Sequence, residues 1–521
     1  MRYSYALILG ALFFFLLYKF LRFDALGYSF NDMYAFLQMS SSWMDGRPFM
    51  YDNIWGYHHR IHNYYTVLLW GPLCYTLGAK GVFIAQTTLL LLAYWLTNRH
   101  LIRQSVPAQT RTALLLVVLL SPIPFWLNDH PNIGWHTELT YLPAALFWAV
   151  GLGGEGRGRF NWSVKGEGRG RFWVVMAGLF LVLVREEGAV LALLIHASAV
   201  ALRNGRQSDR ESSRVNPLVG LLKNARFWAV VIGWSVVFLA GMIWLAAKNN
   251  SPDPRLQNAL KQIVAHADEW VFWQQMLLLL LKSLLLLVPV AALLFGLSRS
   301  LQARSRMLIW GSWLTGILVL TIINMVQSAH YTGQPLFYLV SLTWPPRFVL
   351  LWGFSAAFLV LVVTTFKTSI GLVPARTAWR TVAFLWLLQL PILSLARPDL
   401  PGWAEWKAAF WGPPGAGMNP QFLDPDDLKN LRAIADQLPP RSNVFAFDQV
   451  MPYFHRHYGI WPTGNQWQPA DIAVLSRPDF QHLRPRLNTL LPGPIDSLQL
   501  KNYTVYYRPD FGRFVRPQRA K

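Results

Sequence analysis

Acidic and imidazole side chains gather in residues 22–80, directly after the first apolar run of the chain. They are Asp24, Asp32, Asp45, Asp52, His58, His59 and His62. Asp32 belongs to the sequence FNDMYAFLQ, where we expect an interfacial helix with Asp32, Phe36 and Gln38 on one side. A carboxylate at a membrane surface can deprotonate an acceptor hydroxyl or bind a divalent cation, and Asp is also a favoured N-cap. Asp32 is therefore a candidate for catalysis, with helix capping as the alternative.

A second group of polar side chains lies in the sequence DHPNIGWHTE, which ends at Glu138. His136 and Glu138 are too close in sequence to share a helix face, so an extended or turn geometry is needed to point both at one ligand. A histidine beside a carboxylate suits either a metal site or an acid–base pair. The spacing is not that of a dedicated zinc site.

The sequence Arg185-Glu186-Glu187-Gly188 stands between two apolar stretches, residues 172–184 and 189–202. Ionisable residues near membrane depth usually face a polar cavity or one another. The alternative is a hairpin tip that extends into water, where the same charges cost little.

Aromatic and basic residues lie together in residues 327–347. His330-Tyr331 and the sequence WPPR, which ends at Arg347, offer an aromatic surface and a guanidinium at a helix entrance. Arg pairs with phosphate through two hydrogen bonds, and Trp and Tyr favour the headgroup level, so this segment suits a lipid phosphate. An arginine that snorkels beside an aromatic belt is the alternative.

About eleven apolar stretches, of which the clearest are about 18 residues or longer, must position these groups. Hydrophobic residues make up 53% of the chain and charged residues 14%. A soluble protein would carry nearer a quarter charged residues. The sequence therefore predicts an all-α polytopic membrane protein. The single cysteine, Cys74, excludes an intrachain disulfide.

The net charge of +21 has two readings, binding to nucleic acid or orientation in a membrane. The arginines cluster in short loops between apolar runs, at residues 99–111, 153–171, 203–226, 298–306 and 367–380. The positive-inside rule places such loops in the cytoplasm, so we expect no nucleic-acid partner. The first run continues to Phe20 with Lys19 and Arg22 at its end, which predicts an uncleaved span with a cytoplasmic N-terminus.

Charge asymmetry also divides the chain into domains. Residues 64–77 are apolar but short and contain Pro72, so we expect an interfacial or re-entrant helix there and the second span at residues 81–97. Residues 1–396 then form the transmembrane domain. Residues 397–521 form a small extracytoplasmic α/β domain, with a helix at 424–438 and strands at 443–447, 471–476 and 503–508.

In this order along the chain, the motifs resemble those of bacterial polytopic membrane proteins that are classed under a domain of unknown function and related to the GT-C glycosyltransferases. That family has a motif like DLGIFDQ in its first outer loop, which reads DMYAFLQ here, from Asp32 to Gln38. The Asp and the Gln match, whereas Tyr34 and Leu37 replace the family's Gly and second Asp. The other matching positions are His62, Pro72-Leu73, Gln86, His136, Glu138, Arg185-Glu186-Glu187 and His330-Tyr331.

The resemblance implies a GT-C-like bundle in the bacterial cell membrane and transfer of a sugar from a polyprenyl-phosphate donor to a glycan, lipid or protein acceptor on the outer face. It selects Asp32 as base or metal ligand, with Glu138 and His136 as further catalytic candidates. Gln38, His62, Arg185, Glu186, Glu187, His330, Tyr331 and Arg347 become candidates for substrate binding. Mg²⁺ or Mn²⁺ is a possible cofactor, with Asp32, His136 and Glu138 as its ligands.

Two other functions compete with this hypothesis. A transporter typically shows an internal repeat of spans, and no repeated half is found here. The loss of the family's second Asp at Leu37 leaves open a non-catalytic scaffold of the same fold, embedded in membrane lipids.

Overall fold

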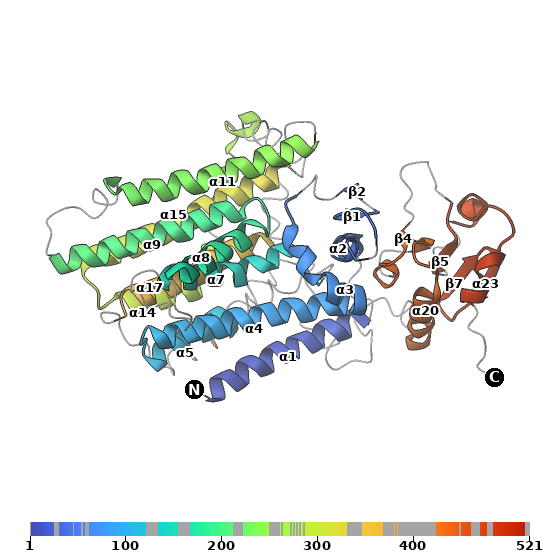
Figure 1. Cartoon of the computed structure of the whole chain (residues 1–521), viewed down its shortest axis with the longest axis horizontal. Helices are drawn as coiled ribbons and strands as arrows, with labels where there is room; N and C mark the ends of the chain where they lie inside the picture. The colour runs from blue at the N-terminus through green and yellow to red at the C-terminus, as the bar shows by residue number, and fades with distance from the viewer. Residues whose placement is uncertain are drawn as a thin grey trace.

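The computed structural model describes residues 2–24, 31–44, 46–53, 56–57, 62–120, 134–154, 167–211, 222–249, 287–330, 346–367, 424–446, 450–459, 469–476 and 483–515, with scattered positions in 261–284 and 380–383. A bundle of long helices occupies one side of the molecule and a smaller sheet domain the other (Figure 1). Short elements of the segment after the first helix lie between them (Figure 1).

The bundle contains helices from α1 to α17. They are α1 (Arg2–Asp24), α4 (Ala79–Arg103), α5 (Ala108–Leu120), α7 (Tyr141–Gly154), α8 (Glu167–Val182), α9 (Gly188–Glu211), α11 (Ala225–Asn249), α14 (Val288–Ser298), α15 (Ala303–His330) and α17 (Pro346–Thr365). Within the described residues, five helices are long and apolar enough to cross a membrane, namely α4, α9, α11, α15 and α17. The predicted polytopic helical class is confirmed. The apolar stretch that ends at residue 396 lies largely outside the described residues.

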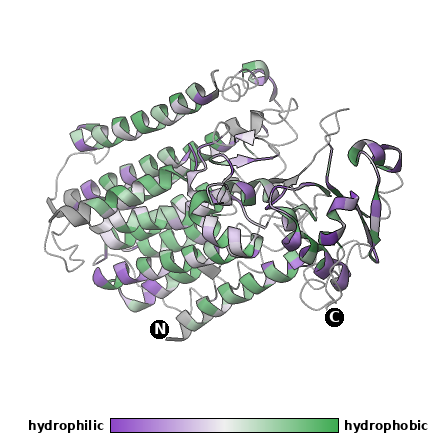
Figure 2. Cartoon of the chain, turned by 45° about the vertical axis from the view of Figure 1, so that its right-hand side comes forward, coloured by the Kyte–Doolittle hydropathy of each residue, from purple (hydrophilic) through white to green (hydrophobic). Residues whose placement is uncertain are grey.

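The apolar helices differ in how far the protein itself covers them. In α17, 94% of the apolar window is buried, because it packs against α7, α9 and α15. In α11 the corresponding share is 6%, and α11 lies at the edge of the bundle against α9 (Figure 1). The bundle is mainly hydrophobic, whereas the sheet domain carries more hydrophilic residues (Figure 2). An outer helix with so much exposed apolar surface suits contact with lipid.

The elements after α1 are short. They are α2 (Asn31–Ser41), the hairpin of β1 (Tyr51–Asp52) and β2 (Gly56–Tyr57), the 3-10 helix η2 (Tyr65–Trp70) and α3 (Gly71–Leu77). A Cβ on Gly71 would lie 2.5 Å from the carbonyl oxygen of Ser40, so glycine is what lets α3 pack closely against α2. The segment expected at the interface, residues 64–77, corresponds to η2 and α3 and is followed directly by α4.

The C-terminal domain combines helices with one mixed sheet. Its elements are α20 (Pro425–Gln437), β3 (Asn443–Ala446), η6 (Met451–Phe454), β4 (Tyr458–Gly459), β5 (Ile472–Ser476), η7 (Arg484–Arg486), α22 (Leu487–Leu490), β6 (Asp496–Gln499), β7 (Tyr503–Tyr507), η8 (Pro509–Phe511) and α23 (Gly512–Val515). The strand order is β4-β3-β5-β7-β6. The strands β4, β3 and β5 are parallel, and β7 pairs antiparallel with β5 and β6.

Both faces of this sheet are covered. Alternate residues such as Val444 and Val474 join one hydrophobic cluster, while Phe445 and Ala473 join another. This alternation is the period-two pattern that predicted the strands, and β3, β5 and β7 lie where expected. Asp424 is the N-cap of α20 and accepts hydrogen bonds from the amides of residues 426 (2.9 Å) and 427 (3.4 Å).

The C-terminal domain is joined to the bundle at the end of α1. The Asp24 carboxylate binds Lys80 of α4 at 2.7 Å and also Arg432 of α20. The Tyr453 hydroxyl donates to the backbone carbonyl of Phe23 at 3.1 Å. Polar contacts therefore tie the sheet domain to the end of α1, and Asp24 also links that end to α4.

Candidate functional site

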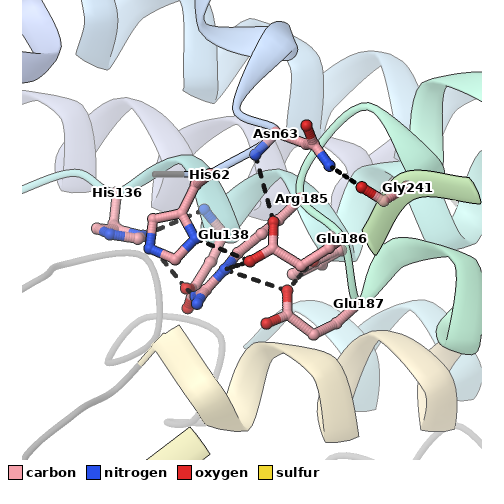
Figure 3. A network of polar contacts seen from close by, with 9 residues as sticks. His62, Asn63, His136, Glu138, Arg185, Glu186, Glu187 and Gly241 are labelled. Atoms are coloured by element: carbon pink, nitrogen blue, oxygen red, sulfur yellow. Dashed lines mark hydrogen bonds and ion pairs between the residues drawn. The ribbon is translucent and has the colours of Figure 1, made fainter. Parts of the chain in front are cut away.

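A buried polar network forms where three segments of the chain meet (Figure 3). The first segment is His62 and Asn63, just before η2. The second contains His136 and Glu138 at the start of the 3-10 helix η3 (Thr137–Thr140), and the third is the turn of residues 185–187 between α8 and α9. Residues far apart in sequence therefore share one polar site.

The tight turn between α8 and α9 brings its charged residues to the other segments. A Cβ on Gly188 would lie 2.0 Å from the carbonyl oxygen of Leu181, so only glycine fits at the start of α9. The backbone amide of Thr66 donates to the carbonyl of Leu183 at 3.1 Å, and the hydroxyls of Thr66 and Thr137 lie 3.3 Å apart. These bonds hold η2 against both the turn and η3.

Arg185 is the cation at the centre of the network. Its guanidinium binds the carboxylate of Glu138, and its Nε lies 3.3 Å from Glu186 and 3.1 Å from Glu187. The side chain of Arg185 is 11% exposed and that of Glu138 4% exposed. Removing one partner of such a buried ion pair typically costs about 3–5 kcal/mol, because a charge is left uncompensated.

A histidine ring and a backbone amide are further hydrogen-bond partners of the Glu186 carboxylate. One carboxylate oxygen lies 2.8 Å from Nδ1 of His62, and the other accepts from the backbone amide of Asn63 at 3.3 Å. The Asn63 side chain donates to the carbonyl of Gly241 at 3.5 Å, which links the network to α11. Both oxygens of Glu186 are thus satisfied from one segment of chain.

The two neighbouring glutamates titrate in opposite directions. Burial raises the pKa of Glu187 to about 8; the charge of Arg185 opposes this effect, and the charges of Glu186 and Glu138 add to it. Burial also raises the pKa of Glu186, but His62 and Arg185 lower it more, so its pKa lies well below its usual value. Glu187, which accepts a hydrogen bond from the Tyr141 hydroxyl at 3.2 Å, therefore holds its proton near neutral pH whereas Glu186 is ionised.

His136 is fixed by its own backbone and by aromatic rings. Its backbone is extended, as its spacing from Glu138 required, and its ring Nδ1 accepts from the backbone amide of Glu138 at 3.3 Å. The rings of Phe36 and Tyr64 lie against its imidazole, with centroids at 5.0 and 5.8 Å. The ring of Tyr64 also lies 5.7 Å from the Arg185 guanidinium.

His136 and Glu138 each have a polar atom that is already bound within the protein. Nδ1 of His136 is occupied by a backbone amide, and the Glu138 carboxylate is bound to Arg185. In the part of the chain that the structure describes, no group of three or more His, Cys, Asp or Glu side chains is arranged to hold a metal ion. A metal-ligand role for Asp32, His136 and Glu138 stays a prediction.

Six residues singled out from the sequence come together in this network: His62, His136, Glu138, Arg185, Glu186 and Glu187. Asp32 is the second residue of α2, and its side chain lies outside the described residues. The same holds for the side chains of His330, the last residue of α15, and of Arg347, the second residue of α17. Tyr331 lies wholly outside the described residues.

The expectation that Phe36 and Gln38 share one side of α2 is wrong. Phe36 faces His136, whereas the Gln38 amide donates to the carbonyl of His457 in the C-terminal domain at 2.8 Å. Residues two apart on an α-helix point about 200° away from each other, which is the physical reason. Substrate binding by Gln38 stays a prediction. Its side-chain amide already forms a hydrogen bond between α2 and the C-terminal domain.

Several buried residues of this region were missed from the sequence. Asn63, Tyr64 and Tyr141 belong to the network, and their only signal in the sequence is that they lie close to His62 or Glu138. Lys19 lies within α1, is 1% exposed and donates to the carbonyl of Gly134 at 2.8 Å. A lysine inside an apolar run is a recognisable signal, because such charges are costly in a membrane and seek a partner.

The arrangement supplies fixed charges and one titratable carboxyl group in a buried setting. Electrostatic groups that are held in place stabilise charge in a reaction without reorganising. The charge of Arg185 is balanced by the carboxylates of Glu138 and Glu186, so its geometry fits an organising role better than that of a free anion receptor.

The fold is similar to that of ArnT from Cupriavidus metallidurans. The crystal structure of ArnT bound to undecaprenyl phosphate matches with a TM-score of 0.51 and 13% sequence identity, over 98% of this chain and 99% of that chain. The apo structure of ArnT matches with a TM-score of 0.48 and 13% identity, over 96% and 97% of the two chains. The bundle and sheet domain described here therefore form an ArnT-like GT-C fold, as expected from the sequence. No protein-family model and no curated protein matches the sequence.

Proposed function

We propose that this protein is a membrane glycosyltransferase that moves a sugar from a polyprenyl-phosphate-linked donor to an acceptor on the extracytoplasmic face. The observation that carries the proposal is the likeness to ArnT, which includes both the bundle and the C-terminal domain. ArnT was crystallised with undecaprenyl phosphate, a lipid of the proposed donor class. The buried network of histidine, arginine and carboxylates supports it from the chain's own residues.

In the proposed reaction the acceptor hydroxyl attacks the anomeric carbon of the donor sugar. Its proton passes to Asp32, and the bond between the sugar and the lipid phosphate breaks with its electron pair on the phosphate. The leaving phosphate then needs a nearby positive charge. Since Arg185 is already bound by carboxylates, Arg347 is the better candidate for this role.

The network is assigned to positioning in this scheme. Arg185 and Glu138 fix the turn of residues 185–187 against η3, and His136 supports the ring of Phe36 on α2. Asp32 lies on the same helix, four residues before Phe36. A Mg²⁺ or Mn²⁺ ion bound by Asp32 would supply further positive charge near the leaving phosphate.

Replacing Asp32 tests the proposal. In membranes supplied with polyprenyl-phosphate-linked sugars, Asp32→Ala is expected to lower the transfer rate by roughly 100-fold or more, because a general base of this kind contributes about 10²–10⁴. Asp496→Asn, which changes an exposed carboxylate on β6, serves as the control. Transfer that survives Asp32→Ala at the wild-type rate would remove Asp32 from the mechanism.

A scaffold role is the second candidate, and one observation favours it. Tyr34 and Leu37, which stand where the resembling family has Gly and Asp, are 0% and 1% exposed and serve packing. Wild-type protein that neither transfers sugar nor binds a polyprenyl phosphate, yet keeps its thermal unfolding transition, would support this scaffold role.

A further inference from the structure

Helix α2 is held between the buried network and the C-terminal domain, with a different face toward each. Tyr34 and Gln38 are one turn apart and face the C-terminal domain. Phe36 lies on the other side and faces the network. Figure 1 shows α2 between the bundle and the sheet domain. If the C-terminal domain shifts, α2 therefore moves relative to the buried network, and if the network shifts, α2 moves relative to the C-terminal domain.

Tyr34 is an anchor of α2 in the C-terminal domain. It is 0% exposed and belongs to the same hydrophobic cluster as Leu431, Phe454 and Val505 of that domain. Its hydroxyl donates to the carbonyl of His457 at 2.6 Å. A residue of the first segment thus completes the core of a domain that begins almost four hundred residues later.

Gln38 strengthens the same contact. Its Nε2 donates to the His457 carbonyl at 2.8 Å and to the Tyr34 hydroxyl at 2.7 Å, and its Oε1 accepts from the backbone amide of Asn53 at 2.8 Å. The ring of His457 in turn bonds through Nε2 to the carbonyl of Ala435 on α20 at 2.9 Å. This chain of bonds fixes α2 to the helix that covers the sheet.

On the opposite side, Phe36 packs into the aromatic wall of the network. Its ring centroid lies 5.0 Å from that of His136, 5.7 Å from Tyr64 and 5.2 Å from Trp135. Tyr64 and His136 contact Arg185 and Glu138 directly. The position of α2 is therefore mechanically linked to the charged residues of the site.

We propose that Tyr34 and Gln38 are positioning residues, through which the C-terminal domain holds α2 and its Asp32 in register with the buried network. The link to sugar transfer rests on the proposed function, whereas the contact itself does not. On this proposal the C-terminal domain is a structural part of the site rather than a separate binding module.

The single cysteine of the chain reports whether α2 stays in place. Cys74 of α3 is 0% exposed, and its Sγ donates to the carbonyl of Leu37 on α2 at 3.2 Å. A thiol reagent can therefore reach Cys74 only after local opening around α2, and the labelling rate measures that opening.

The test compares labelling of Cys74 by a maleimide in wild type and in the double variant Tyr34→Phe, Gln38→Leu. These replacements remove the hydrogen bonds to His457 and the one between Gln38 and the Asn53 amide, while the side-chain volumes change little. We expect labelling to be roughly tenfold faster or more, since several buried hydrogen bonds are lost together. Tyr507→Phe is the matched control, because Tyr507 lies in the same cluster and its hydroxyl has no hydrogen-bond partner among the described residues. A labelling rate equal to that of Tyr507→Phe would overturn the proposal.

A second readout separates positioning from stability. In the transfer assay, the double variant is expected to lower kcat at least about tenfold while KM for the lipid donor changes less than about twofold, because the reacting geometry and not the donor contact is disturbed. An unchanged kcat would overturn the link to transfer. If wild type shows no transfer but the variant still labels faster, the proposed function fails and the docking of α2 stands.

Discussion

Glu187 is the residue whose charge is most sensitive to pH in the network. Its pKa is raised from its ordinary value of 4.5 to about 8, first because it is buried and then because Glu186 and Glu138 are near. Between these values an unfolded chain has lost the proton and the folded protein keeps it. The unfolded state then binds fewer protons, so Glu187 lowers the stability as pH rises through this range.

Glu187→Gln is therefore expected to flatten the pH dependence of stability between pH 5 and pH 8. The variant removes a change in the free energy of unfolding of at most about 1.4 kcal/mol per pH unit, which is the value for one proton. The check is the thermal unfolding temperature in detergent at several pH values in this range. Asp436→Asn, an exposed change on α20, is the control. A slope that is the same in wild type and Glu187→Gln would show that Glu187 ionises normally in the fold.

At the level of elements, the contact between α2 and α3 depends on the absence of a side chain at Gly71. A Cβ there would lie 2.5 Å from the Ser40 carbonyl oxygen and 2.6 Å from Nε1 of Trp43. Backbone is one of these neighbours, so the strain cannot be relieved by a rotamer change alone.

Gly71→Ala is expected to destabilise the protein by about 1–3 kcal/mol, the usual range for overpacking. It should also accelerate labelling of Cys74, because α3 must move away from α2. Gly233→Ala on α11 is the matched control, since nothing lies within 4 Å of its Cβ position and alanine favours a helix by up to about 1 kcal/mol. Equal unfolding temperatures for the two variants would contradict the described packing.

Elements with a strong local pattern could be predicted from the sequence. The length of the apolar runs, the Asp424 cap of α20 and the alternation in β5 and β7 are local features that do not depend on distant residues. Strand β6 was missed because its sequence DSLQ is polar and largely exposed at the sheet edge. It forms a strand because β7 provides its hydrogen-bond partners.

Six residues of the buried network could be singled out from the sequence, but their geometry could not. Charged groups in apolar surroundings marked residues 185–187, and the spacing of His136 and Glu138 required an extended backbone there. The pairing of Arg185 with Glu138 and of His62 with Glu186 joins residues 47 and 124 apart in sequence, and no local rule selects such partners. The division of α2 into two functional faces likewise depends on what packs against it.

On the scale of the whole molecule, the orientation in the membrane is a prediction from charge. Basic loops should face the cytoplasm, which places the C-terminal domain outside. Alkaline phosphatase fused after Lys521 is therefore expected to be active, and a fusion after Arg206 inactive, whereas green fluorescent protein should show the reverse pattern. Fluorescence from a fusion at Lys521 would invert the proposed topology and place the network on the cytoplasmic side.

The C-terminal domain and the bundle act as one unit in this fold. Asp24 and Tyr34 of the first segments bind Arg432 and His457 of the last domain, and the likeness to ArnT extends over both parts. The proposed transferase function depends on this unit binding a polyprenyl phosphate.

Binding of a polyprenyl phosphate to the purified protein in nanodiscs tests that dependence most directly. Wild type is expected to bind saturably, and Arg347→Ala to weaken binding by about tenfold or more, because a charged hydrogen bond to phosphate contributes about 1.5–3 kcal/mol. Arg226→Ala, at the exposed start of α11, should bind as wild type does. No saturable binding by wild type, with or without added Mg²⁺ or Mn²⁺, would contradict a glycosyltransferase that uses a polyprenyl-phosphate donor.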